Sequence, residues 1–301
     1  MKRVFIVGRG RSGTTLLQSM MAAHSQIYST SSTNTICDIV GQFQKRTFGR
    51  TALTLREKII DSLQDLRIGL GFCSKKCHSR IKSSQKHPEF SERLDFFLDG
   101  YQGSSLKIMI AAFVQAMDSL AVRHEKTLWV EKTALNIGYI DVIERFVPDA
   151  QFIHLTRPGC DTVASIFDLV QKHDRWRETY SNSLDRCLDS WVNAVRATQF
   201  HCKKQNHRSF LYQDLVSDPE AILMAMCQFV GTEFSTQMIE NSVAAATQIV
   251  IGNQPWKNGV FTALDKKVES KFTKILSAAQ QKAVLQRLES ENLVDLTSLR
   301  S

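Results

Sequence analysis

The feature that most constrains the fold of this chain is a glycine-rich turn close to its amino end. Four apolar residues, 4–7, are typical of a buried strand, and a helical pattern starts near Thr14. The turn between them is Gly8-Arg9-Gly10-Arg11-Ser12-Gly13. Glycines let a backbone turn sharply and approach an anion closely, and the following helix adds its positive dipole end. The segment therefore predicts a phosphate-binding loop in an α/β fold.

The spacing of the turn is that of a Walker loop, but the cation of that motif is missing. Four residues separate Gly8 from Gly13, and Thr14 and Thr15 follow where a nucleotide triphosphatase has Lys before its Ser or Thr. Arg11 is the replacement that the sequence offers, because a guanidinium fork suits an oxyanion. A tight strand-to-helix connection without a ligand also explains the glycines, so a second anion site is needed to decide.

A second candidate anion site lies in residues 151–166, again a strand, a turn with Pro and Gly, and an amphipathic helix. Arg157 ends the predicted strand and Ser165 follows two helical turns later. The two side chains can flank one phosphate if the helix folds back beside the strand end. A surface arginine and a helix-packing serine are the alternatives.

Together the two segments resemble the 5′-phosphosulfate loop and the 3′-phosphate motif of sulfotransferases that use 3′-phosphoadenosine 5′-phosphosulfate (PAPS). Three further segments agree in order. Residues 129–136 resemble the Glu-Lys-Thr-Pro segment of the family, with Ala134 in place of Pro. Trp191 lies in a predicted long helix, and residues 211–219 resemble the Tyr-Glu-Asp-Leu stretch. The resemblance covers about residues 3–35 and 127–232 and is closest to the branch with bacterial and tyrosylprotein sulfotransferases.

The resemblance implies a P-loop-type three-layer α/β fold with a central, mainly parallel sheet. It also implies PAPS as the donor, 3′-phosphoadenosine 5′-phosphate (PAP) as the product, and no required metal. The implied cofactor-binding residues are Arg9, Gly10, Arg11, Ser12, Gly13, Thr14, Thr15, Arg157, Ser165 and Tyr212. Arg11 would clamp the phosphosulfate, and Lys132 would stabilise the leaving group or the sulfuryl oxygens during in-line transfer to a hydroxyl or amine.

The general base is the weakest part of this resemblance. The tyrosylprotein branch has a glutamate after the glycine-loop helix, whereas this chain has Ser31-Ser32-Thr33 at the matching place. Glu131, beside Lys132, is the candidate substitute as base. A structural role for Glu131 is the alternative.

The chain reads as one domain over residues 1–301. Strands are predicted near 3–8, 127–131, 151–156 and 209–212, and a helical insertion over about 36–125 separates the first from the second. Within the insertion, a stripe of Met109, Phe113, Met117 and Leu120 indicates core packing. A terminal amphipathic helix is expected over 277–291, and residues 256–259 are a candidate loop over the cofactor.

Charge and composition limit the classes of ligand and partner that we expect for this chain. The net charge of +8 favours anionic ligands. The basic run at 75–87 lacks interleaved aromatics, so we expect no nucleic-acid partner but a solvated loop, an anionic acceptor or a lipid surface. Cys73, Cys77 and His78 lack a fourth ligand for zinc, so no metal site is expected. No leader or transmembrane run is predicted, and the scattered cysteines are consistent with reduced thiols. We therefore expect a cytoplasmic protein.

Two other function classes stay open from sequence alone. An ATP-dependent small-molecule kinase needs a phosphate-reaching cation and a magnesium carboxylate, and neither stands at the expected spacing. A non-catalytic nucleotide-binding relative would explain why the base is missing while the cofactor residues remain. The acceptor is open among small molecules, glycans, lipids and peptides, and the oligomeric state is not predicted.

Overall fold

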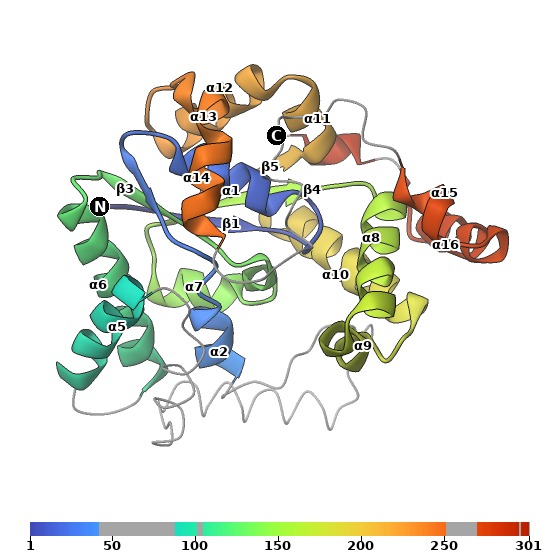
Figure 1. The fold of residues 1–301 in the computed structure, drawn as a ribbon, viewed down its shortest axis with the longest axis horizontal. Helices are drawn as coiled ribbons and strands as arrows, with labels where there is room; N and C mark the ends of the chain where they lie inside the picture. The colour runs from blue at the N-terminus through green and yellow to red at the C-terminus, as the bar shows by residue number, and fades with distance from the viewer. Residues whose placement is uncertain (42–87, 101–104, 251–269, 295, 301) are drawn as a thin grey trace.

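The computed structural model describes residues 1–41, 88–100, 105–250, 270–294 and 296–300 (Figure 1). The strands are β1 (Lys2–Val7), β2 (Ile27–Ser29), β3 (Leu128–Lys132), β4 (Ala150–Thr156) and β5 (His207–Leu211). The helices before β4 are α1 (Thr14–Ala22), α2 (Thr35–Gly41), α5 (Pro88–Gly100), α6 (Leu106–Arg123), the 3-10 turn η1 (Ala134–Gly138) and α7 (Ile140–Phe146). The later helices are α8 (Gly159–Lys172), α9 (Asp174–Tyr180), α10 (Leu184–His201), α11 (Tyr212–Ser217), α12 (Pro219–Val230), α13 (Gln237–Glu240), α14 (Ser242–Ile249), α15 (Lys271–Ile275), α16 (Ala278–Ser290) and the 3-10 turn η3 (Thr297–Leu299).

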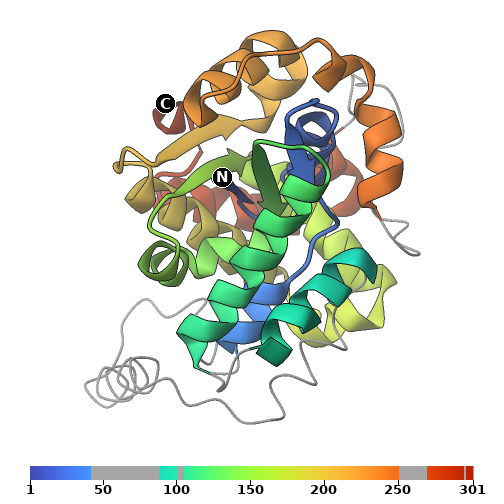
Figure 2. The same ribbon diagram turned by 90° about the vertical axis from the view of Figure 1, so that its left-hand side faces the viewer.

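The five strands form one parallel sheet in the order β2-β3-β1-β4-β5. Side chains of β1 alternate between its faces, as strand geometry requires. Val4 and Ile6 enter a cluster with α1, α12 and α13, while Phe5 and Val7 enter a cluster with α2, α5, α6 and α7. The side view shows the sheet between these two helical layers (Figure 2). The predicted three-layer α/β fold is confirmed.

The four predicted strands are all present, with ends within two residues of their expected positions. The sequence missed β2, which has only three residues and pairs with β3 at the sheet edge. In the described part of the predicted insertion, α2, α5 and α6 are helical, and the methionine and phenylalanine stripe of α6 is fully buried. That stripe is core packing.

A third hydrophobic cluster lies beyond the carboxyl ends of β1 and β4. It joins α8, α9, α10, α15 and α16 around Trp191, which is fully buried. The predicted terminal helix is α16, and it begins with a capping box between Ser277 and Gln280. These helices pack beside the carboxyl ends of the strands, where the predicted cofactor-binding residues lie.

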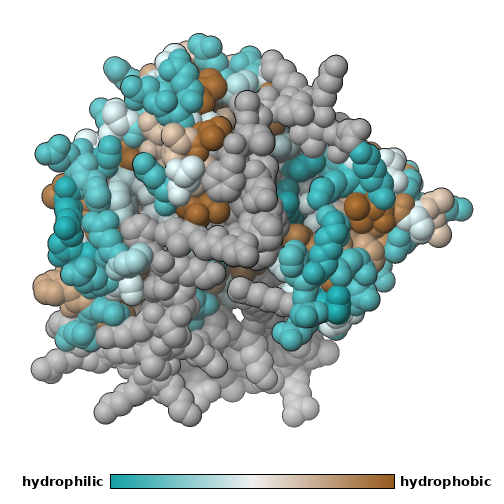
Figure 3. All heavy atoms as spheres, viewed as in Figure 1, coloured by the Kyte–Doolittle hydropathy of each residue, from teal (hydrophilic) through white to brown (hydrophobic). Residues whose placement is uncertain are grey.

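The described surface on the face of Figure 1 is mostly hydrophilic, and its hydrophobic side chains form small separate groups (Figure 3). None of the helices in the described ranges is long and apolar enough to cross a membrane. The basic run at 75–87, the cysteines at 73 and 77, and the predicted loop at 256–259 lie outside the described residues.

Candidate functional site

The glycine loop connects the end of β1 to α1 at the carboxyl edge of the sheet. Gly8 lies so close to β4 that an added Cβ would come within 2.4 Å of the Leu155 carbonyl oxygen. Arg11 and Gly13 both have positive φ, 81° and 88°, and the Ser12 N–H donates to the Arg9 carbonyl at 3.1 Å. The loop is therefore a sharply folded turn rather than an extended connection.

The amino end of α1 is open toward this turn. Its first helical hydrogen bond runs from the Leu17 N–H to the Gly13 carbonyl, so the N–H groups of residues 14–16 have no partner within the helix. Gly13 provides no side-chain cap. The Ser12 hydroxyl is fully buried, and its oxygen has no hydrogen-bond partner among the described residues. Orphan donors at a helix amino end, with a buried hydroxyl beside them, fit an anionic group.

Arg11 reaches from the loop to α8. Its Nε donates to the Ser165 hydroxyl at 3.1 Å, so the structure joins Ser165 directly to the glycine loop. Burial lowers the pKa of the Arg11 guanidinium below its ordinary value, and the positive charge of Arg157 lowers it further. Two guanidinium groups near each other, away from bulk water, favour an anion between or beside them.

Arg157 follows β4 and is held by several neighbours. Its guanidinium lies over the Tyr212 ring, 4.9 Å from the ring centre, and 3.6 Å from the Asp161 carboxylate. Its carbonyl accepts a hydrogen bond of 3.0 Å from the indole N–H of Trp191. The Tyr212 ring also packs against Gly13, where an added Cβ would meet ring carbons at 2.3 and 2.5 Å. Tyr212 therefore bridges the glycine loop and Arg157.

Arg9 is buried and points toward α9 and α10. Its Nε donates to the Ser190 hydroxyl at 3.0 Å, and its guanidinium lies 5.4 Å from the centre of the Tyr180 ring. Sequence reasoning missed Ser190 and Tyr180, because no motif marks them. Their contacts show how the glycine loop is attached to α9 and α10.

Lys132 and Glu131 end β3 as the sequence predicted, and both are buried. The Lys132 ammonium donates to the hydroxyl of Ser32, a residue of the segment where the family glutamate is missing. Lys132 therefore stands at the same carboxyl edge as the glycine loop and Arg157.

Both carboxylate oxygens of Glu131 accept hydrogen bonds. Oε1 accepts from Thr133 at 2.6 Å and from Thr33 at 3.2 Å, and Oε2 accepts from Asn136 at 2.9 Å. Burial raises the pKa of Glu131, whereas these hydroxyl contacts and Lys132 oppose the rise. Glu131 thus ties the segment after β2 to the turn after β3, an arrangement typical of a positioning residue.

Sequence comparison relates the chain to known proteins. A family model described as "Sulfotransferase family" matches residues 3–236. A curated relative, an uncharacterized protein from Aquifex aeolicus (strain VF5), is 23% identical over 245 residues, which is 79% of this chain and 26% of that protein. The chain thus spans about a quarter of the length of that relative.

Three solved structures share the fold. The sulfotransferase domain of the Synechococcus PCC 7002 olefin synthase is 17% identical, with a TM-score of 0.56 over 95% of this chain and 94% of that one. The sulfotransferase domain from the curacin biosynthetic pathway is 16% identical, with a TM-score of 0.52 over 96% and 97%. A mouse sulfotransferase solved in complex with PAP is 12% identical, with a TM-score of 0.52 over 96% and 84%.

Proposed function

The chain belongs to the sulfotransferase family, and from this membership we propose that it transfers a sulfuryl group from PAPS to a hydroxyl or amine of an acceptor. The observation that carries the proposal is the pair of guanidinium groups, Arg11 and Arg157, beside the open amino end of α1. Two separate anion-binding elements match a donor that carries a 5′-phosphosulfate and a 3′-phosphate.

The residues present fit such a donor. The N–H groups at the start of α1, the orphan hydroxyl of Ser12 and the guanidinium of Arg11 are suited to the phosphosulfate. Arg157 is suited to the 3′-phosphate, and so is Ser165, whose hydroxyl accepts a hydrogen bond from Arg11. The Tyr212 ring, which lies under the Arg157 guanidinium, is suited to contact the purine of the donor. The PAP bound in the mouse relative supports this choice of donor.

When bound, PAPS supplies the sulfuryl group that the acceptor atom attacks. Negative charge then develops on the oxygen that leaves with the 5′-phosphate, so cations held near that oxygen lower the barrier. We assign this stabilisation to Arg11 and Lys132. Ser32 holds the Lys132 ammonium at the sheet edge, so little reorganisation is needed during transfer. For Glu131 we propose a positioning role first and a role as base second, since three side chains already occupy its oxygens.

Thermal unfolding with PAP, 5′-AMP and ATP·Mg tests the donor class. We expect PAP to stabilise the wild type most, because PAP carries the 3′-phosphate that Arg157 is suited to bind. A ligand at 100 times its dissociation constant adds about 2.7 kcal/mol to the free energy of unfolding. Arg157→Ala should remove the advantage of PAP over 5′-AMP. Arg208→Ala is the matched control, since Arg208 lies over the Phe229 ring at 5.7 Å but is exposed near the start of β5. Stabilisation by ATP·Mg alone would overturn the proposal and favour a kinase.

Turnover separates an enzyme from a non-catalytic relative. Transfer of labelled sulfate from PAPS to a panel of alcohols, phenols, sugars, lipid headgroups and peptide tyrosines would identify the acceptor among small molecules, glycans, lipids and peptides. PAP binding without transfer to any of them would favour the non-catalytic reading. We further propose that residues 1–301 act as one domain, because strands from both sides of the segment 36–125 share one sheet.

A further inference from the structure

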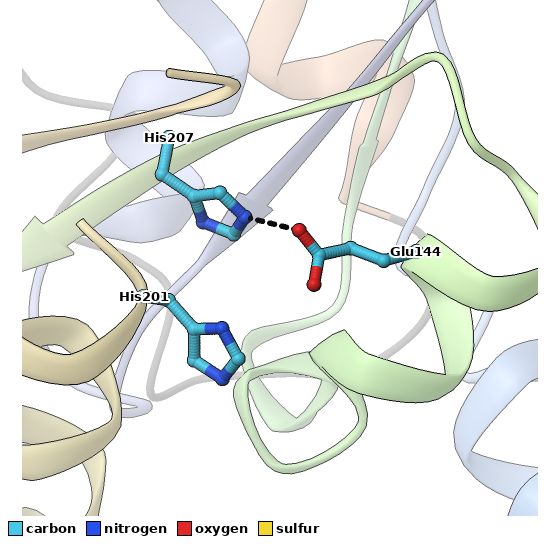
Figure 4. A group of neighbouring side chains, drawn as sticks. All are labelled: Glu144, His201 and His207. Atoms are coloured by element: carbon cyan, nitrogen blue, oxygen red, sulfur yellow. Dashed lines mark hydrogen bonds and ion pairs between the residues drawn. The ribbon is translucent and has the colours of Figure 1, made fainter. Parts of the chain in front are cut away.

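A second polar cluster lies on the sheet face that α7 and α10 cover, away from the proposed donor site. Glu144 of α7, His201 at the end of α10 and His207 at the start of β5 each offer one ligand atom, and these atoms lie within 4.8 Å of one another. Figure 4 shows the carboxylate and the two imidazole rings around one common space. The donor site lies past the other end of β5, roughly 13 Å along the strand.

We propose that Glu144, His201 and His207 bind a divalent transition-metal ion of the zinc type. Two imidazole nitrogens and one carboxylate are ligands that zinc takes in proteins, often with a fourth position left to water. Both histidine side chains are buried and come from different elements, so their positions are fixed by the fold. The ion would link α7 to the neighbouring elements α10 and β5, with Glu144 and His207 63 positions apart in the sequence.

The ring nitrogen of His207 that faces away from the common space is already engaged. His207 pairs through Nδ1 with Nε2 of His154 at 2.9 Å, and Nδ1 of His154 pairs with the Thr198 hydroxyl at 3.1 Å. The remaining nitrogen of His207, Nε2, lies 2.9 Å from a Glu144 oxygen. A ligating histidine held through its other nitrogen is the usual arrangement in metal sites.

His201 has a matching orientation. Its Nδ1 lies 3.3 Å from the ammonium of Lys204, and its Nε2 lies 3.9 Å from an Asp141 oxygen. An ammonium has only donors, so the lone pair of Nδ1 faces it and the proton resides on Nε2, toward the Asp141 carboxylate. The lone pair of His201 Nδ1 is therefore directed to the side where the Lys204 ammonium lies.

Lys204 shows that this space attracts positive charge. Its ammonium contacts Glu144 Oε2 as well as His201 Nδ1, and thus touches two of the three proposed ligands. The Lys204 side chain is 39% exposed, so it can turn outward into water. An incoming ion would displace the ammonium, and Lys204 therefore competes with the metal.

The test uses the full chain, freed of metal by a chelator and titrated with Zn²⁺ by calorimetry and with Co²⁺ by visible absorption. We expect one equivalent at this site, and at least tenfold tighter binding in Lys204→Met, where the competing charge is gone. His201→Gln and Glu144→Gln should weaken binding by a hundredfold or more. His124→Gln is the matched control, because His124 also pairs with a glutamate, Glu89 at 3.0 Å, but on the surface.

Three results would overturn the proposal. The first is Lys204→Met binding Zn²⁺ no more tightly than the wild type. The second is unchanged affinity in both His201→Gln and Glu144→Gln. The third is a Co²⁺ spectrum with thiolate charge-transfer bands, if the double variant Cys73→Ser/Cys77→Ser loses these bands and binds no Co²⁺ at all. Circular dichroism and stabilisation by PAP show whether each variant is folded. An unfolded variant could also bind Zn²⁺ through its exposed cysteines, so tighter binding in Lys204→Met counts only where circular dichroism shows a folded protein. The metal site can fail while PAP binding holds.

Discussion

The Tyr212 ring leaves no room for a side chain at Gly13 in the proposed donor site, and Gly13→Ala tests the importance of this close packing. Gly13 has φ of 88°, a conformation that residues with a Cβ rarely adopt. The new Cβ would stand 2.3 Å from Cδ2 and 2.5 Å from Cε2 of Tyr212. The ring cannot turn away freely, because the Arg157 guanidinium lies 4.9 Å from its centre. The substitution therefore combines backbone strain with overpacking.

The expected loss of stability follows from these two effects. A left-handed backbone costs an alanine about 1–2 kcal/mol, and overpacking costs about 1–3 kcal/mol. We expect urea denaturation to show the free energy of unfolding reduced by about 2–5 kcal/mol. PAP should also bind more weakly, because Tyr212 and the start of α1 must shift.

Gly10→Ala is the matched control in the same loop. Gly10 does not have positive φ, and nothing lies within 4 Å of an added Cβ. Its replacement should change stability by less than about 1 kcal/mol. The double variant Gly13→Ala/Tyr212→Ala should show favourable coupling of at least about 1 kcal/mol, since the overpacking disappears. Equal losses in the two glycine variants, or zero coupling, would show that the Tyr212 ring does not restrict residue 13.

Three further predictions concern charged side chains. Glu131→Gln should lower the free energy of unfolding by about 1–3 kcal/mol in urea; normal stability and PAP binding with no turnover would instead mark Glu131 as the base. Lys132→Met should leave PAP binding intact and slow sulfuryl transfer by about 100-fold or more, and full activity would contradict its role. Burial alone would raise the pKa of Asp168, but Lys172 and Lys271 hold it below its ordinary value. The stability from this lowered pKa is complete above about pH 4 and is lost as pH falls through the folded value. Asp168→Asn should therefore flatten the loss of stability with acid, and parallel acid-unfolding curves for the two proteins would disprove this.

Local patterns in the sequence were enough to predict the strand, turn and helix units that carry the proposed donor site. The apolar run of β1, the glycine spacing after it and the repeat of the same pattern around Arg157 are local signals, because strand burial, sharp turning and helix start depend on neighbouring residues. In parallel α/β sheets the carboxyl ends of strands share one edge, so the sequence was enough to place Arg11, Lys132 and Arg157 together. The strand β2 escaped because three residues carry no readable period.

The contacts between distant side chains follow from the packing of the folded chain. Ser165 accepts from Arg11, 154 positions away, and Tyr212, which follows the edge strand β5, packs on Gly13, which follows the central strand β1. Glu131 accepts a hydrogen bond from the hydroxyl of Thr33, 98 positions away, and no spacing rule predicts that contact. The cluster of Glu144, His201 and His207 likewise gathers side chains from two helices and a strand. Such contacts depend on helix packing against the sheet, and packing is set by the whole core rather than by any local pattern of residues.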